Sequence, residues 1–371
     1  MNNCSTILCA CASLLCTSPA WAAADAPSSV QIYGLIDEGV QYVDHAAVGN
    51  QTRSVVETGA GMLTSLLGFR GNEDLGDGLH AVWELESGFA PNNGTLQQAR
   101  MFGRQAYVGL DGHFGRLTIG RQYTMRAFAT GPINMFGAGA QGITTFDSSV
   151  ANPRADNAIS YRISLTHELD VGINYSLGRD AVATVPVTAV ATDCGGEAVT
   201  WKQCKEASAL IRYTASNWGL DSAYERNNGG TATTFGGLTS PALSDSRLVV
   251  GGYRQIGDWK LALGLMKRNN MGIATPKSNL TWFMTTWQAA PNLAIDGMLA
   301  QLKYAQSPNQ AAAVALRAAY SLSKQTVLYV TAEHIDNQGN LAIAASTLSP
   351  AYNPLPGGSQ LAVIAGIKLT F

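Results

Sequence analysis

Apolar residues return at every second position in one segment after another of this 371-residue chain. A period of two is the period of a β-strand, in which successive side chains point to opposite faces. The last segment shows it most clearly, with one face formed by Leu361, Val363, Ala365, Ile367, Leu369 and Phe371. Further segments of roughly ten residues, separated by Gly, Pro, Asn and Asp, follow one another from residue 30 onward. The sequence therefore predicts an all-β protein.

The connections between these segments alternate in length. Short ones are expected at 72–78, 111–115, 216–219, 255–258 and 290–292, and long ones at 124–155, 180–206, 227–245 and 335–358. Short turns at one end and long loops at the other are typical of transmembrane antiparallel β-barrels of the outer membrane. We therefore expect a closed barrel of this type.

The low charge content supports a membrane location for the barrel. Only 13% of the residues are charged, against ~25% in an average soluble protein. A soluble β-sandwich or β-solenoid, the alternative fold, turns one face of its strands to water and needs more charge. A closed barrel in a bilayer pairs every backbone polar group. The net charge of −2 argues against a nucleic-acid partner.

The N-terminal residues fit a secretory signal peptide. An apolar core at 7–16 precedes Ala20-Trp21-Ala22, whose small residues suit cleavage after Ala22. A lipid-anchored Cys11 is the alternative, although the apolar run before it is short. We expect residues 1–22 to be removed and 23–371 to form the barrel. At roughly one strand per 22 residues, the remaining 371 − 22 = 349 residues give about sixteen strands.

Two cysteines, Cys194 and Cys204, remain after the predicted cleavage site. They lie ten positions apart in a polar stretch of an exported chain, where such a pair favours a disulfide. No histidine lies near them, so a zinc site is the weaker interpretation.

Five segments and the last residue resemble a known family. They are Ser28–Asp37, Leu67–Leu79, Phe102–Leu110, Gly115–Gln122, Arg154–Tyr161 and the terminal Phe371. They are similar to the first strands, the first periplasmic turn, the strands around the third loop and the aromatic end of the trimeric general porins of β-proteobacteria. The resemblance implies a homotrimer of barrels of about sixteen strands in outer-membrane lipid. It also implies that the third external loop, Thr124 to Asp156, folds inward and narrows the pore.

The same resemblance implies a site in that narrow region. Arginines on the wall would be Arg104, Arg121 and Arg154, with Arg70 near them, and acidic residues on the loop would be Asp147 and Asp156. A further arginine of the family pattern falls at Leu66 and is missing here. Because the arginines outnumber the loop acids, we expect a weak preference for anions.

The function implied is passive diffusion of small hydrophilic solutes and ions through a water-filled channel, with neither enzymatic activity nor a cofactor. A substrate-specific channel is the nearest alternative. A barrel enzyme such as a lipid hydrolase, or an adhesin acting through its external loops, represents a different class of function.

Two other patterns have structural interpretations. The glycines of 137–142 match the spacing of a nucleotide-binding loop, but neither a preceding strand nor a following helix is predicted there. Glu84 and Glu86 share one face of a strand without a partner nucleophile, so we expect them to line the lumen.

Overall fold

The computed structural model describes residues 29–48, 51–151, 153–178, 202–230, 237–348 and 352–371, and the predicted signal peptide lies outside them. The strands are β1 (Ser29–Val48), β2 (Gln51–Gly59), β3 (Leu66–Gly76), β4 (Leu79–Gly88), β5 (Gln105–Gly112), β6 (Gly115–Tyr123), β7 (Arg154–Ser164), β8 (Leu169–Ser176), β9 (Glu206–Thr214), β10 (Trp218–Asn228), β11 (Ser244–Ile256), β12 (Trp259–Asn270), β13 (Lys277–Ala290), β14 (Leu293–Tyr304), β15 (Gln310–Ser321), β16 (Thr326–Gln338) and β17 (Ser359–Thr370). The helices are α1 (Met125–Thr130), α2 (Ser148–Ala151) and the 3₁₀ turns η1 (Gln97–Ala99) and η2 (Gly131–Ile133). No helix within these ranges is long and apolar enough to cross a membrane.

The strands form one closed antiparallel barrel. From β3 to β17 each strand pairs with the next one in the chain, β2 and β3 both pair with β1, and β1 pairs with β17, with Leu35 opposite Thr370. The backbone of Phe371 exchanges hydrogen bonds of 3.0 Å in both directions with Gly34. A Cβ on Gly34 would lie 2.6 Å from the ring of Phe371, so this glycine makes room for the terminal aromatic residue.

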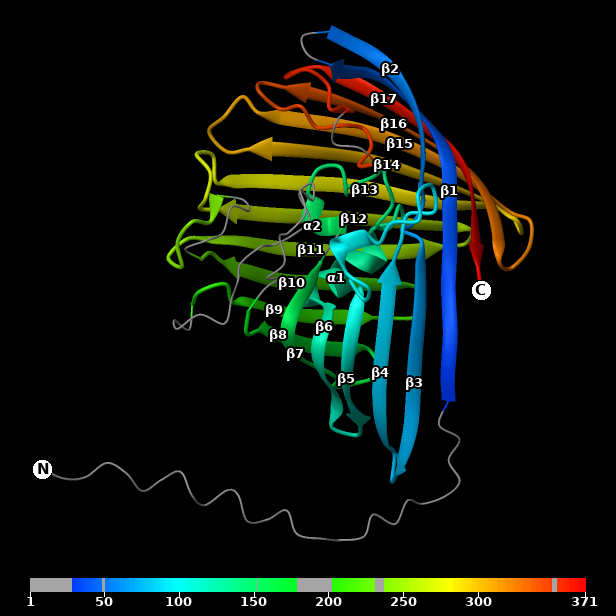
Figure 1. Cartoon of the computed structure of the whole chain (residues 1–371), viewed down its shortest axis with the longest axis vertical. Coiled ribbons are helices and arrows are strands. Elements are labelled where there is room, and N and C mark those ends of the chain that lie inside the picture. Colours follow the sequence, from blue (N-terminus) through cyan, green and yellow to red (C-terminus); the bar gives the residue numbers. More distant parts are fainter. Residues whose placement is uncertain (1–28, 49–50, 152, 179–201, 231–236, 349–351) are drawn as a thin grey trace, which may run out of the picture.

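Seventeen strand segments occupy sixteen positions in the barrel. β2 and β3 both pair with β1, whose long ribbon runs past each of them in Figure 1. Gly59 lies opposite Gly39 and Leu66 opposite Leu35, so residues 60–65 interrupt a single strand. The predicted sixteen-stranded barrel is therefore confirmed.

The two faces of the strands follow the predicted alternation. In β17 and at its end, Ile367, Leu369 and Phe371 are 46%, 41% and 48% exposed, whereas Ala362 and Ile364 are fully buried. Outward apolar side chains of this kind suit hydrocarbon. The interior face carries polar groups such as Asp37 and Gln41, both buried.

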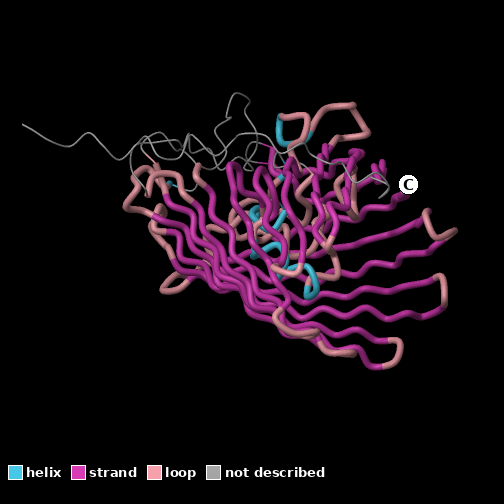
Figure 2. The backbone as a smooth tube through the Cα atoms, turned by 90° about the horizontal axis from the view of Figure 1, so that it is seen from below, coloured by secondary structure: helices cyan, strands magenta, loops and turns pink. Residues whose placement is uncertain are grey.

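The loop between β6 and β7, residues 124–153, lies inside the barrel (Figures 1 and 2). We call it the inward loop. Its helix α1 contacts β9, β10 and β11. Ile133, Phe136 and Ile143 of the loop are buried in one apolar cluster with Trp282 and Met284 of β13. This apolar packing holds the loop against one side of the wall.

Candidate functional site

The arginines implied by the resemblance meet at one tyrosine. Tyr123, the last residue of β6, accepts hydrogen bonds of 2.9 Å from Nη2 of Arg104 and from Nη2 of Arg154. The guanidinium of Arg154 also lies 4.6 Å from the centre of the Tyr123 ring, a cation–π distance. The phenol thus holds two like charges side by side on the wall.

Arg121 and Asp156 complete this group. Arg121 forms an ion pair with Asp156 and donates a 2.7 Å hydrogen bond to the carbonyl of Gly103. Arg100 forms a second ion pair with Asp156, with 3.0 Å between Nη1 and Oδ2. Arg104, Arg121 and Arg154, which we call the arginine cluster, are therefore brought together as expected.

Asp156 does not lie where the sequence placed it. The inward loop ends at Pro153 and β7 begins at Arg154, so Asp156 belongs to the wall and not to the loop. Residues two apart in a strand share a face, which puts Asp156 on the same face as Arg154. Its carboxylate therefore neutralises arginines from their own side and does not oppose them across the pore.

The positive charge of Arg104 is also neutralised by acidic residues of the wall. It forms an ion pair with Glu86, whose neighbour on the same face is Glu84. Tyr33 donates to both carboxylates, at 2.7 Å to Glu84 and 3.0 Å to Glu86, and Tyr107 donates to Glu84 at 2.7 Å. These contacts place both glutamates on the interior face, as predicted.

Arg70 is linked to the arginine cluster through a tyrosine. Its Nε donates a 2.8 Å hydrogen bond to Gln31, and its guanidinium lies 4.9 Å from the centre of the Tyr33 ring. The hydroxyl of Tyr33 donates to Glu86, the ion-pair partner of Arg104. In the register of β3 and β4, Arg70 stands opposite Glu84.

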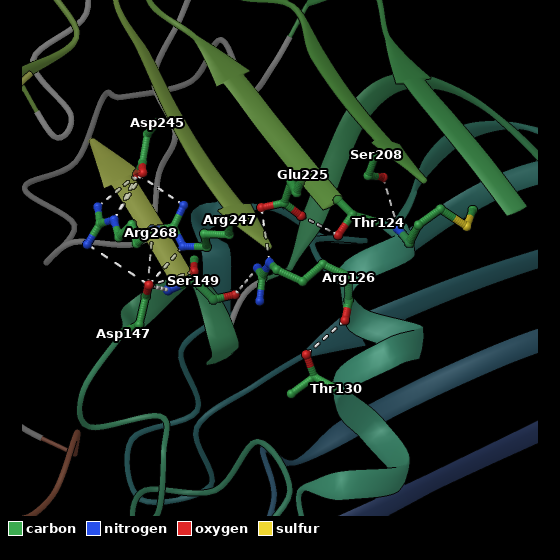
Figure 3. A network of polar contacts seen from close by, with 11 residues as sticks. Thr124, Arg126, Thr130, Asp147, Ser149, Ser208, Glu225, Asp245, Arg247 and Arg268 are labelled. Atoms are coloured by element: carbon green, nitrogen blue, oxygen red, sulfur yellow. Dashed lines mark hydrogen bonds and ion pairs between the residues drawn. The ribbon is translucent and has the colours of Figure 1, made fainter. Parts of the chain in front are cut away.

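Asp147 lies on the inward loop, as predicted, but it contacts other arginines (Figure 3). Arg247 of β11 donates to it through Nε at 2.8 Å and Nη2 at 3.2 Å, and Arg268 of β12 lies 4.0 Å away. Asp245 pairs with both arginines at 3.0 and 2.8 Å. Asp147 is thus paired with arginines of β11 and β12, which anchor the loop to that wall, and its opposition to the arginine cluster stays a prediction.

Electrostatics keep this anchor charged. Burial by itself would raise the pKa of Asp147, but the positive charges of Arg247 and Arg268 outweigh it and hold the pKa well below its usual range. The carboxylate is therefore ionised at all ordinary pH values.

A second anchor joins the start of the loop to β10. Nε of Arg126 lies 3.1 Å from Glu225, and the hydroxyl of Thr124 donates to Glu225 at 2.6 Å (Figure 3). Sequence reasoning missed Glu225, Asp245 and Arg247. Their charge on the inward face of a strand is visible in the alternation, but the loop partners of Glu225 and Arg247 lie about 100 residues away in the chain.

A cleft of about 480 Å³ separates the inward loop from the wall that carries Arg154. Phe128 of α1 contacts the wall beside this cleft. The guanidinium of Arg162 in β7 lies 4.2 Å from the centre of the Phe128 ring, and Arg212 of β9 donates a hydrogen bond to the Phe128 carbonyl. Arginines thus continue along the wall beyond the arginine cluster.

The predicted disulfide involves Cys194, which lies outside the described residues, whereas Cys204 is buried. The bond stays a prediction, and resistance of both thiols to alkylation before reduction would test it. Across the described part of the chain, no group of three or more His, Cys, Asp or Glu side chains could hold a metal ion.

The family of Gram-negative porins matches residues 10–340, most of the chain and all of the site described above. This chain belongs to that family. An outer membrane porin protein of Bordetella pertussis is 39% identical over 174 residues, which are 43% of this chain and 45% of the relative. The outer membrane porin protein 32 of Delftia acidovorans is 33% identical over 165 residues, 42% of this chain and 45% of that protein. The matched part thus spans less than half of these relatives.

Solved porin structures share the fold of this porin over nearly its whole length. An anion-selective porin from Comamonas acidovorans matches with a TM-score of 0.74 and 22% identity, covering 93% of this chain and all of the other. OmpF of Salmonella typhi, in complex with daunomycin, matches with a TM-score of 0.64 and 18% identity, covering 93% and 98% of the two chains. The porin is an outer-membrane β-barrel and not an enzyme.

Proposed function

We propose that this porin is a general diffusion channel with a weak preference for anions. The observation that carries the proposal is how the two predicted loop acids are paired: Asp147 pairs with Arg247 of β11, and Asp156 lies on the wall and pairs with Arg121. On the near wall, Arg100, Arg104, Arg121 and Arg154 lie close together, with Arg100 and Arg121 paired with Asp156 and Arg104 with Glu86. An arginine-rich wall on one side of the passage favours anions.

We expect the channel to pass small hydrophilic solutes in general, because the polar side chains along its wall are hydrogen-bonded to one another. The anion-selective porin from Comamonas acidovorans, which shares the fold, supports the sign of the preference. Glu84 lowers the net positive charge beside Arg104, so the preference is weak.

The reversal potential in a KCl gradient tests this proposal. Replacing Arg104, Arg121 and Arg154 together with Gln should move it toward the cation side by on the order of 10 mV, out of the ~59 mV that a tenfold gradient sets for perfect selectivity. Arg226→Gln is the matched control, because Arg226 is exposed on β10 and bonds only to Asn228 among the contacts described. An unchanged reversal potential in the triple variant would exclude the arginine cluster from ion selection.

We also propose that the porin is a homotrimer. Glu38 of β1 lies between Ile36 and Val40, which are 42% and 55% exposed on the outer face. The exposed apolar side chains beside Glu38 offer a neighbouring copy a surface on which to pack, while the carboxylate oxygens of Glu38 are themselves already buried. The trimeric state of OmpT of Vibrio cholerae, a porin of similar fold, is in line with this arrangement.

A further inference from the structure

The cleft beside the inward loop has the size and lining of a ligand site. Its volume of about 480 Å³ falls within the ~300–1,000 Å³ range of small-molecule sites. Phe128, Pro132 and Ala138 line it on the loop side, and Tyr123 and Arg154 on the wall side. One surface is thus apolar and the opposite one carries a charge.

The charges that line the cleft are all positive. Arg126, Arg154 and Arg212 lie among its lining residues, which include no carboxylate. The acids that pair with Arg126 and Arg212, Glu225 and Asp221, have side chains only 3% and 1% exposed and do not reach the lining. An anion in the cleft would therefore meet guanidiniums without a competing negative charge.

Two polar atoms at the cleft have unused hydrogen-bonding capacity. Arg126, 1% exposed, uses Nε for Glu225 and Nη2 for the carbonyl of Ser149, while its buried Nη1 has no hydrogen-bond partner (Figure 3). Oδ1 of Asn134 is likewise buried without a partner. Because both atoms are buried, they do not form part of the accessible lining of the cleft, and the guanidinium groups that line it carry its charge.

The apolar side of the cleft is held in place. The ring of Phe128 has Arg162 at 4.2 Å from its centre and the edge of Tyr123 at a centroid distance of 6.5 Å and an angle of 79°. Pro132 and Pro153 stiffen the loop backbone beside it. A fixed aromatic surface opposite guanidiniums is complementary to a molecule with one apolar end and one anionic end.

We propose that this cleft is a binding subsite for small amphipathic carboxylates, with the carboxylate toward Arg154 and Arg212 and the apolar body against Phe128 and Pro132. The proposal rests on the diffusion function proposed above, because the ligand reaches the cleft through the lumen. The subsite binds such solutes on their way through the channel, whereas chloride and acetate have no binding site of this kind.

Purified full-length porin in planar bilayers tests the proposal with benzoate as the probe and acetate as the reference. Benzoate should reduce the KCl conductance saturably, with a half-maximal concentration about tenfold below that of acetate, because only benzoate buries apolar surface. Ala138→Asp should raise the half-maximal concentration of benzoate about tenfold, because it places a negative charge in the lining. Ala138→Asn, whose side chain has the shape of Asp without the charge, should raise this concentration less.

The outcomes separate this inference from the general function. Failure to form conducting pores would overturn the diffusion function and the subsite with it. Normal KCl conductance with equal effects of benzoate and acetate would overturn the subsite alone. Equal benzoate values for Ala138→Asp and Ala138→Asn would also overturn it, because the guanidiniums would then not hold the carboxylate.

Discussion

At the scale of the residue, the course of the inward loop is set by charges that face the interior. Asp147 is held by Arg247 and Arg268, and Arg126 by Glu225, each pair joining the loop to a strand of the far wall. Buried ion pairs are weak sources of net stability, but the loss of one partner leaves the other charge buried and uncompensated. We therefore expect these pairs to fix the position of the loop more than the stability of the barrel.

Asp147→Asn tests the loop anchor. The variant should lower the free energy of unfolding by about 2 kcal/mol, because Arg247 retains Asp245 but loses one ionic partner. It should also increase the open-channel current noise as the loop moves more freely. Thermal unfolding in detergent and single-channel recording measure the two effects. Asp258→Asn, in the exposed turn between β11 and β12, is the control.

Moderately acidic pH should not reproduce the effects of Asp147→Asn. Folding lowers the pKa of Asp147, so its contribution to stability is present above the usual aspartate range of ~3.9 and is lost only as the pH falls through the lowered value. Noise that rises already between neutral pH and about pH 5 would contradict the assigned anchor.

At the scale of the element, the break between β2 and β3 is organised by one carboxylate. Asp37 of β1 accepts backbone hydrogen bonds from Gly61, Met62 and Leu63 at 3.2, 3.0 and 2.8 Å. The hydroxyl of Tyr329 in β16 also donates to it at 2.5 Å. The carbonyl of Gly61 in turn accepts from Ala140 at 3.0 Å, so the interruption supports the tip of the inward loop.

Replacing Asp37 tests this support. Asp37→Ala removes the acceptor of the Met62 and Leu63 N–H groups, whereas the Gly61 N–H keeps the hydroxyl of Tyr329, so the cost is about 1–3 kcal/mol for each of the two groups that water does not reach. Asp37→Asn retains one side-chain oxygen and should lose less stability. The unfolding temperature in detergent should be highest for the wild type, lower for Asp37→Asn and lowest for Asp37→Ala. An Ala variant as stable as the wild type would show that residues 60–65 hold their shape without Asp37.

At the scale of the whole molecule, closure and the outer face decide how the porin sits among its neighbours. Pairing of β1 with β17 removes every sheet edge, and the outward side chains are apolar except at positions such as Glu38. The carboxylate oxygens of Glu38 are buried, so the surface that a neighbouring copy would meet here is formed by apolar side chains such as Ile36 and Val40.

The proposed trimer should be visible in single-channel records. Insertion events in planar bilayers should produce conductance in groups of three equal, ohmic steps, because three parallel pores enter together. Chemical cross-linking of the detergent-solubilised protein should give a species of three times the mass of the chain, 39.1 kDa before any cleavage. Isolated single steps together with a monomeric cross-linked product would contradict the trimer.

The sequence by itself determined the barrel and its strand faces, whereas the arginine cluster followed only from the resemblance to a known family. Alternation is a local property, so Ile367 and Ile364 could be assigned to opposite faces without any knowledge of their neighbours. Only the tertiary structure decided the partners of the acids: Asp156 on the wall with Arg121, and Asp147 on the inward loop with Arg247 of β11. Such pairs depend on where a loop without strand periodicity packs inside the lumen, and that is settled by apolar contacts and charges about 100 residues apart.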